Sequence, residues 1–139
     1  PTLNKELHFT ANTNCLLMIG PSRGGLEMFL TLARYPELQT RVKKVVALSS
    51  ILDLHQQISS RPDDMKQMLI DDFGYSDGVK GEAWIAQRDP LETIPALSKS
   101  LPILIVQGTA DPRVTLEEGQ HMAKALNESG HQVNYWEIS

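Results

Sequence analysis

The apolar residues of this chain gather in four short runs that are separated by longer segments with helical periodicity. The runs at 15–19, 42–50, 102–106 and 133–138 predict strands, because each is short, continuous and bounded by polar or turn residues. Strands that are apolar along their whole length are typical of parallel sheets buried on both faces. The chain order therefore predicts an α/β fold: a parallel sheet of about four strands with flanking helices, in three layers, α/β/α, joined by right-handed crossovers.

Three segments between these strands carry helix signals. The segment 24–35 has apolar residues nearly all the way round, as in a helix packed deep against a sheet, and Pro36 ends it. In the last segment Thr115 and Glu118 have the spacing of a capping box, and Gly130 stops the helix. Between the second and third strands, residues 54–98 predict a helical excursion above the sheet, with one helix that starts near Pro62.

Length and composition narrow the class of protein. The 139 residues predict one domain, 1–139, and a formal net charge of −4 provides no basic face for nucleic acid. No apolar run approaches the roughly 20 residues of a membrane helix, and no signal peptide is visible, so we expect no membrane partner and a cytoplasmic location. The single cysteine, Cys15, excludes an internal disulfide and a cysteine metal site, and we expect a buried thiol. Nothing indicates a cofactor or a metal.

The first strand runs into a Gly-x-Ser-x-Gly turn, and a helix follows directly. This order predicts a nucleophile elbow, in which a sharp turn lifts the hydroxyl of Ser22 clear of the sheet. We expect a Cβ at Gly20 or Gly24 to crowd the helix against the strand. The backbone N–H of Arg23 would face the oxyanion of an acyl-transfer reaction. The alternative interpretation is a structural strand-turn-helix with an incidental serine.

A serine hydrolase also needs an acid that orients its histidine. Asp111 follows the third strand, so it lies at the same sheet edge as Ser22 if the strands are parallel. Its alternative role is that of a turn-forming aspartate before Pro112. Asp53, just after the second strand, is the alternative acid.

Three motifs of the chain resemble the α/β-hydrolase fold: residues 20–25, 88–91 and 104–114. Within that fold they are most similar to the prolyl oligopeptidase-type (serine peptidase S9) and dienelactone-hydrolase-like catalytic domains, over residues 16–138. The resemblance implies Ser22 as nucleophile, Asp111 as triad acid, and a peptide or ester substrate. Pro21 departs from it, since these peptidases usually place an aromatic residue there.

The resemblance also implies strands before the elbow, one of them with an oxyanion donor, and a histidine loop after the last strand. We therefore expect this chain to be the C-terminal part of a hydrolase domain in a longer protein, called the parent protein below, with the catalytic histidine beyond residue 139. His8, His55, His121 and His131 are predicted to be surface or packing residues. The chain alone should be inactive.

Two further expectations concern partners and alternatives. Without a neighbouring strand, the first strand at 16–19 would expose an apolar edge that favours self-association. A non-catalytic binding or scaffold protein with the same fold, and a carboxylesterase or lipase-like relative, are the alternatives to a peptidase.

Overall fold

A parallel sheet of four strands forms the centre of the fold. The computed structural model describes residues 12–139. Its strands are β1 (Leu16–Ser22), β2 (Val42–Ser50), β3 (Ile103–Gly108) and β4 (Val133–Ile138), in the spatial order β1-β2-β3-β4. All three pairings are parallel, which confirms the predicted α/β class. Because all four strands run in the same direction, their carboxyl ends lie at one edge of the sheet.

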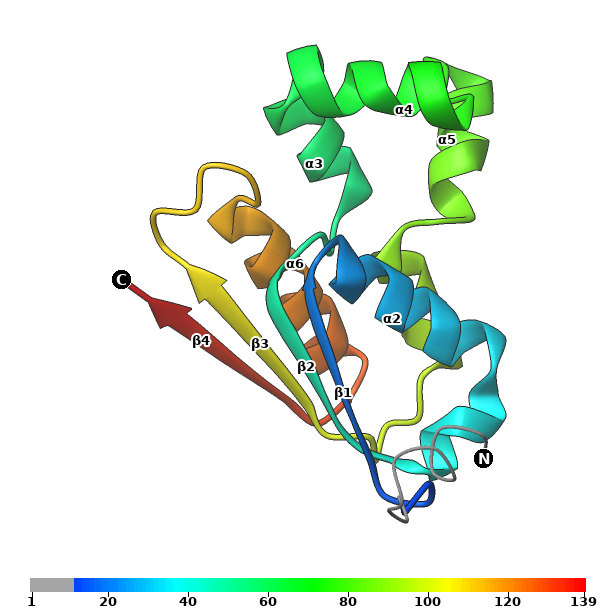
Figure 1. Ribbon diagram of the computed structural model, residues 1–139, viewed down its shortest axis with the longest axis vertical. Coiled ribbons are helices and arrows are strands. Elements are labelled where there is room, and N and C mark those ends of the chain that lie inside the picture. The colour runs from blue at the N-terminus through cyan, green and yellow to red at the C-terminus, as the bar shows by residue number, and fades with distance from the viewer. Residues whose placement is uncertain (1–11) are drawn as a thin grey trace, which may run out of the picture.

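The main hydrophobic core lies between one face of the sheet and two long helices, α2 (Arg23–Arg34) and α6 (Leu116–Glu128). Figure 1 shows both helices on this face. The helices and the strands each contribute side chains with almost no exposed surface: Phe29, Leu32, Met122 and Leu126 from the helices, and Val45, Ala47, Ile103 and Ile105 from the strands. The capping box predicted from Thr115 and Glu118 is present at the start of α6.

The opposite face of the sheet carries exposed apolar side chains. Leu17 and Ile19 of β1 are 58% and 57% exposed, and Trp136 of β4 is 59% exposed. Since α2 and α6 share the other face, residues 12–139 supply two of the three predicted layers. β1 forms one edge of the sheet, so self-association through this edge stays a prediction. None of the helices that the structure describes has the length and apolar character needed to cross a bilayer.

The predicted helical excursion connects β2 to β3, and its larger part, residues 54–86, stands beyond the carboxyl ends of β1 and β2 (Figure 1). It consists of α3 (Leu54–Ser60), the π-helical turn η2 (Pro62–Lys66), α4 (Gln67–Phe73), α5 (Val79–Ala86) and the 3-10 helix η3 (Pro90–Ala96). A second apolar cluster stabilises it; its members are Ile51, Leu54, Ile58, Met65, Leu69, Tyr75, Ile85 and Val114. Residues 54–86 therefore have a core of their own that reaches the loop after β3, whereas η3 packs against the main core through Ile94.

Two expectations about burial are wrong. Cys15 is exposed, because it lies in the turn before β1 and not within the sheet. The helix α2 is buried along one side only, where Met28, Phe29 and Leu32 face the sheet. Its other apolar residues, Leu26 and Leu30, line a cavity of about 340 Å³ beneath the excursion. One apolar side of α2 thus faces the sheet, and the other faces the excursion.

Candidate active site

Ser22 occupies a strained turn between β1 and α2. Its backbone has φ 50° and ψ −125°, a conformation that L-residues rarely adopt. Two contacts hold the turn: the Ile51 N–H donates to the Ser22 carbonyl at 3.1 Å, and the Ser50 hydroxyl donates to the Gly20 carbonyl at 2.6 Å. The Ser22 side chain is exposed and does not cap α2. This geometry presents the hydroxyl to solvent at the carboxyl edge of the sheet.

The space around the elbow depends on two glycines. A Cβ on Gly20 would lie 2.5 Å from the Gly24 carbonyl oxygen, and one on Gly25 would lie 2.3 Å from Cβ of Ser50. A Cβ on Gly24 would meet only Cδ of Pro21, at 3.4 Å, which is van der Waals contact. The crowding expected at Gly24 therefore occurs at Gly25, because it is Gly25 that faces the end of β2.

We predict that Gly25→Ala destabilises the parent protein by about 1–3 kcal/mol, because the new methyl group overlaps Ser50 in a packed contact. Gly24→Ala is the matched control, and we expect it to be neutral or slightly stabilising, since alanine favours the first turn of α2. Urea unfolding of both variants measures the difference. Equal free energies of unfolding would contradict this account of the elbow.

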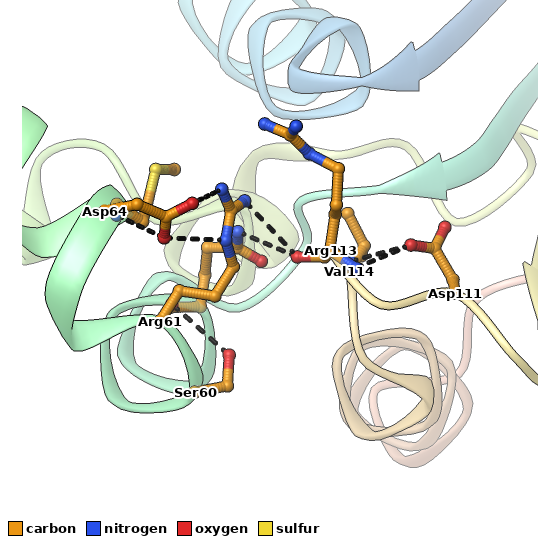
Figure 2. Close-up of polar contacts among 8 residues, drawn as sticks. Ser60, Arg61, Asp64, Asp111, Arg113 and Val114 are labelled. Carbon is orange, nitrogen blue, oxygen red and sulfur yellow. Dashed lines mark hydrogen bonds and ion pairs between the residues drawn. The ribbon is translucent and has the colours of Figure 1, made fainter.

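Asp111 lies in the loop that follows β3, residues 109–115, called the acid loop below. Its Oδ1 accepts hydrogen bonds from the backbone N–H groups of Arg113 at 2.9 Å and Val114 at 3.0 Å (Figure 2). Burial raises the pKa of Asp111, but these two bonds, together with the nearby Ser49 hydroxyl and Arg113 guanidinium, outweigh it and hold the pKa below its ordinary value of 3.8. Asp111 is therefore an ionised carboxylate at neutral pH.

The end of β2 lies between Ser22 and Asp111. Ser22 pairs with Ser50 in the register of the sheet. The neighbouring Ser49 has a strained φ of 41°, and its hydroxyl helps to lower the pKa of Asp111. A Cβ built on Gly108 would be 3.8 Å from both Ser49 Oγ and Asp111 Cβ. The structure thus brings the two sequence candidates to one edge of the sheet, on either side of a single strand.

Asp53, the alternative acid, is buried, and its carboxylate contacts do not involve Ser22. Its Oδ1 accepts from the Gln56 N–H at 2.9 Å and caps α3, and its Oδ2 lies 2.7 Å from Nδ1 of His121. Both carboxylate oxygens are therefore occupied: Oδ1 caps α3, and Oδ2 joins α3 to α6. The Asp53–His121 pair was not predicted, since its partners lie 68 residues apart in the chain.

The described histidines form no hydrogen bond or ion pair with Ser22 or Asp111. Nε2 of His55 lies 3.5 Å from Glu82 on the exposed excursion, and Nε2 of His131 lies 3.2 Å from the Leu97 carbonyl. His8 lies outside the described residues. In the part of the chain that the structure describes, no three side chains of His, Cys, Asp or Glu are arranged to hold a metal ion.

A cavity of about 570 Å³ opens beside Ser22. One wall comes from the elbow, with Arg23 and Gly24, and the opposite wall comes from the excursion and the acid loop. On the opposite wall the Arg61 guanidinium forms a bidentate ion pair with the Asp64 carboxylate. Nε lies 3.0 Å from Oδ1, and Nη2 contacts Oδ2. Figure 2 shows that the Arg113 guanidinium extends away from Asp111. The cavity is thus a mixed polar and apolar site that reaches the exposed serine.

Two buried carboxyl groups lie where the excursion joins the sheet. Glu118 of α6 accepts hydrogen bonds from the Leu52 and Thr115 N–H groups, each at 3.3 Å. Asp89 accepts from the Leu54 N–H at 3.2 Å. Burial raises the pKa of Glu118 to about 8 and the pKa of Asp89 to about 6. Glu118 therefore changes its protonation within the physiological range.

We predict that Glu118 makes the folded protein less stable as the pH rises from 6 to 8. In the unfolded chain Glu118 has a pKa near 4.5 and is ionised in this window, whereas the folded protein retains the proton up to about pH 8. Unfolding then releases a proton, so the free energy of unfolding falls by up to about 1.4 kcal/mol per pH unit. Urea unfolding at both pH values should show a smaller fall for Glu118→Gln. An unchanged slope in this variant would contradict the assignment.

Comparison with known proteins places these features in a family. The sequence profile of the prolyl oligopeptidase family matches residues 3–137. Dipeptidyl peptidase family member 6 of Caenorhabditis elegans is 29% identical over 126 residues, which are 90% of this chain and 17% of that protein. The structure of a Mycobacterium tuberculosis puromycin-hydrolyzing peptidase matches 99% of this chain and 20% of its own, with a TM-score of 0.78 and 22% identity. A carboxylesterase of Lactobacillus plantarum WCFS1 matches 99% of this chain and 48% of its own, with a TM-score of 0.64 and 15% identity.

The likeness to the two solved structures shows the shared α/β-hydrolase fold. The chain spans only 17% to 48% of the length of these three relatives.

Proposed function

We propose that this chain, which belongs to the prolyl oligopeptidase family, carries the nucleophile Ser22 and the triad acid Asp111 of a serine hydrolase. The observation that carries the proposal is the strained, exposed Ser22 at the mouth of a cavity of about 570 Å³, at the same sheet edge as an ionised Asp111. Strain of this kind persists where the surrounding structure determines it and is concentrated at functional sites.

The reaction begins when Ser22 Oγ attacks the carbonyl carbon of a substrate in this cavity and gives its proton to a histidine. The carbonyl oxygen becomes an oxyanion, which the Arg23 N–H stabilises at the N-terminus of α2. Collapse of the tetrahedral intermediate breaks the scissile bond. The leaving group takes the proton from the histidine, and Ser22 retains the acyl group. Water then hydrolyses this acyl-enzyme by the same steps.

The proposed histidine belongs to residues that follow Ser139 in the parent protein. Support comes from β4, whose last residue lies against the start of the acid loop, with the Thr109 N–H donating to the Ile138 carbonyl at 2.8 Å. A chain that leaves β4 here emerges beside Asp111. Because loop amides occupy Oδ1 of Asp111, its Oδ2 is the oxygen proposed to accept from that histidine.

The proposed substrate is a peptide or an ester, because both present an acyl carbon to the same nucleophile. The walls of the cavity combine the cationic Arg23 and Arg113 with the apolar Ile51, Met65 and Val114. Such a lining fits a peptide segment, whose carbonyl groups accept from guanidinium groups while its side chains contact apolar surface. Comparing the turnover of matched peptide and ester substrates by the parent protein distinguishes a peptidase from an esterase.

Burst kinetics with an activated ester test the proposal. We expect the parent protein to release one equivalent of alcohol rapidly and the rest slowly, because the acyl-enzyme accumulates. The 139-residue chain alone should show no burst, because the contacts of its described histidines involve neither Ser22 nor Asp111. A burst from the isolated chain that disappears in His55→Ala would assign the base to the excursion and overturn this arrangement.

A further inference from the structure

Two buried glutamine side chains hold consecutive carbonyl groups of the acid loop. Nε2 of Gln57, on α3, donates to the Arg113 carbonyl at 3.1 Å. Nε2 of Gln107, on β3, donates to the Val114 carbonyl at 2.9 Å. Both glutamines have 0% exposed surface, and they approach the loop from different elements. The loop is therefore held through its backbone by the excursion and by the sheet.

The amide oxygen of each of these two glutamines has no hydrogen-bond partner among residues 12–139. Oε1 of Gln57 and Oε1 of Gln107 are buried and accept no hydrogen bond from residues 12–139. An unpartnered amide oxygen in a protein interior opposes folding. A side chain of similar shape without polar atoms would avoid that cost, so stability alone does not account for glutamine at these positions. The Nε2 contacts with the loop are the remaining reason for an amide at both places.

The held carbonyls belong to the residues that orient Asp111. The N–H groups of Arg113 and Val114 both donate to Asp111 Oδ1, and the carbonyls of the same residues accept from Gln57 and Gln107. We infer that Gln57 and Gln107 are positioning residues, which fix the direction of the Asp111 carboxylate by fixing the peptide groups that bind it. The inference rests on the proposed function, in which Asp111 is the triad acid.

A third contact connects this arrangement to the substrate cavity. Nη1 of Arg61 donates to the Arg113 carbonyl at 3.5 Å, while Nε of Arg61 pairs with Asp64 on the cavity wall (Figure 2). The Arg113 carbonyl thus accepts from two side chains of the excursion, one buried and one at the cavity. Arg61 therefore contributes both to the cavity wall and to the support of the acid loop, whereas Gln57 supports the loop only.

The test replaces each glutamine by methionine, which has a similar length and shape but no donor. In the parent protein we expect Gln57→Met and Gln107→Met each to lower kcat by about 10-fold to 100-fold for an ester substrate, because a small misplacement of a catalytic group has effects of this size. KM should stay unchanged, since neither side chain lines the cavity. In an Asp111→Asn background the same changes should cause no further loss of kcat.

Gln67→Met is the matched control, because Gln67 lies on α4 of the same excursion, is exposed, and donates to Asp71 at 2.9 Å. Its turnover should equal that of the wild type. The inference is overturned if both glutamine variants keep wild-type kcat, or if they lower kcat equally with and without Asp111. If one variant does not fold, the other tests the same inference from the opposite side of the loop. If the wild-type parent protein shows no acyl-enzyme burst, the proposed function itself fails, and this outcome is distinct from the previous two.

Discussion

Ser22→Ala is expected to lower the turnover of the parent protein by about 10⁴-fold or more, while the protein stays folded. The loss should be this large because no other hydroxyl can replace the nucleophile, and what remains is catalysis by the oxyanion site and by binding. Folding should be unaffected, since the Ser22 side chain is exposed and does not cap α2. Steady-state kinetics and thermal unfolding measure the two effects separately.

Ser129→Ala is the control for this variant. Ser129 lies at the end of α6, where its hydroxyl donates to the Ala125 carbonyl at 2.7 Å, at the opposite end of the helix from the acid loop. Its removal should leave turnover unchanged. Turnover at the wild-type rate by Ser22→Ala would refute the nucleophile assignment.

Asp111→Asn is expected to lower turnover by up to about 10⁴-fold, far more than Asp53→Asn does. An asparagine can keep its oxygen on the N–H groups of Arg113 and Val114, so the acid loop should retain its shape. The amide then presents a donor where the carboxylate presented an acceptor, and the histidine is held in the wrong tautomer. The ratio of kcat values for the two variants measures the effect.

Asp53→Asn should instead act on stability. Asp53 caps α3 and lies 2.7 Å from His121, so its replacement weakens contacts between α3 and α6. The loss of free energy of unfolding should be about 1 kcal/mol, typical of a weakened cap or buried polar contact. A larger loss of kcat in Asp53→Asn than in Asp111→Asn would move the acid to Asp53.

The sheet could be predicted because strands buried in a parallel sheet are marked by local sequence alone. The bounds of β2 and β4 agree with the apolar runs, and β1 extends the predicted strand to Ser22. The helix α3 was missed, since seven residues are too few for a clear helical period. The signal for its start is Asp53, which is the N-cap of the helix. From the sequence, Asp53 was considered only as an alternative triad acid.

The candidate site was predictable only where one motif determines the geometry. The elbow and the acid loop are each local, so Ser22 and Asp111 could be placed at one edge once the strands were known to be parallel. The contacts of Gln57 with Arg113, and of Asp53 with His121, join residues that lie 56 and 68 positions apart. Nothing in the local sequence specifies such pairs, because they depend on how the excursion packs against α6 and the acid loop.

Labelling of the parent protein with a fluorophosphonate, followed by mass spectrometry of its peptides, tests the central claim most directly. Such probes react with an activated serine. We predict one adduct, on Ser22, which forms in the wild type and forms far more slowly in Asp111→Asn. The absence of an adduct, an adduct on a different residue, or equal labelling rates in both proteins would contradict the proposal that Ser22 and Asp111 act together as nucleophile and acid.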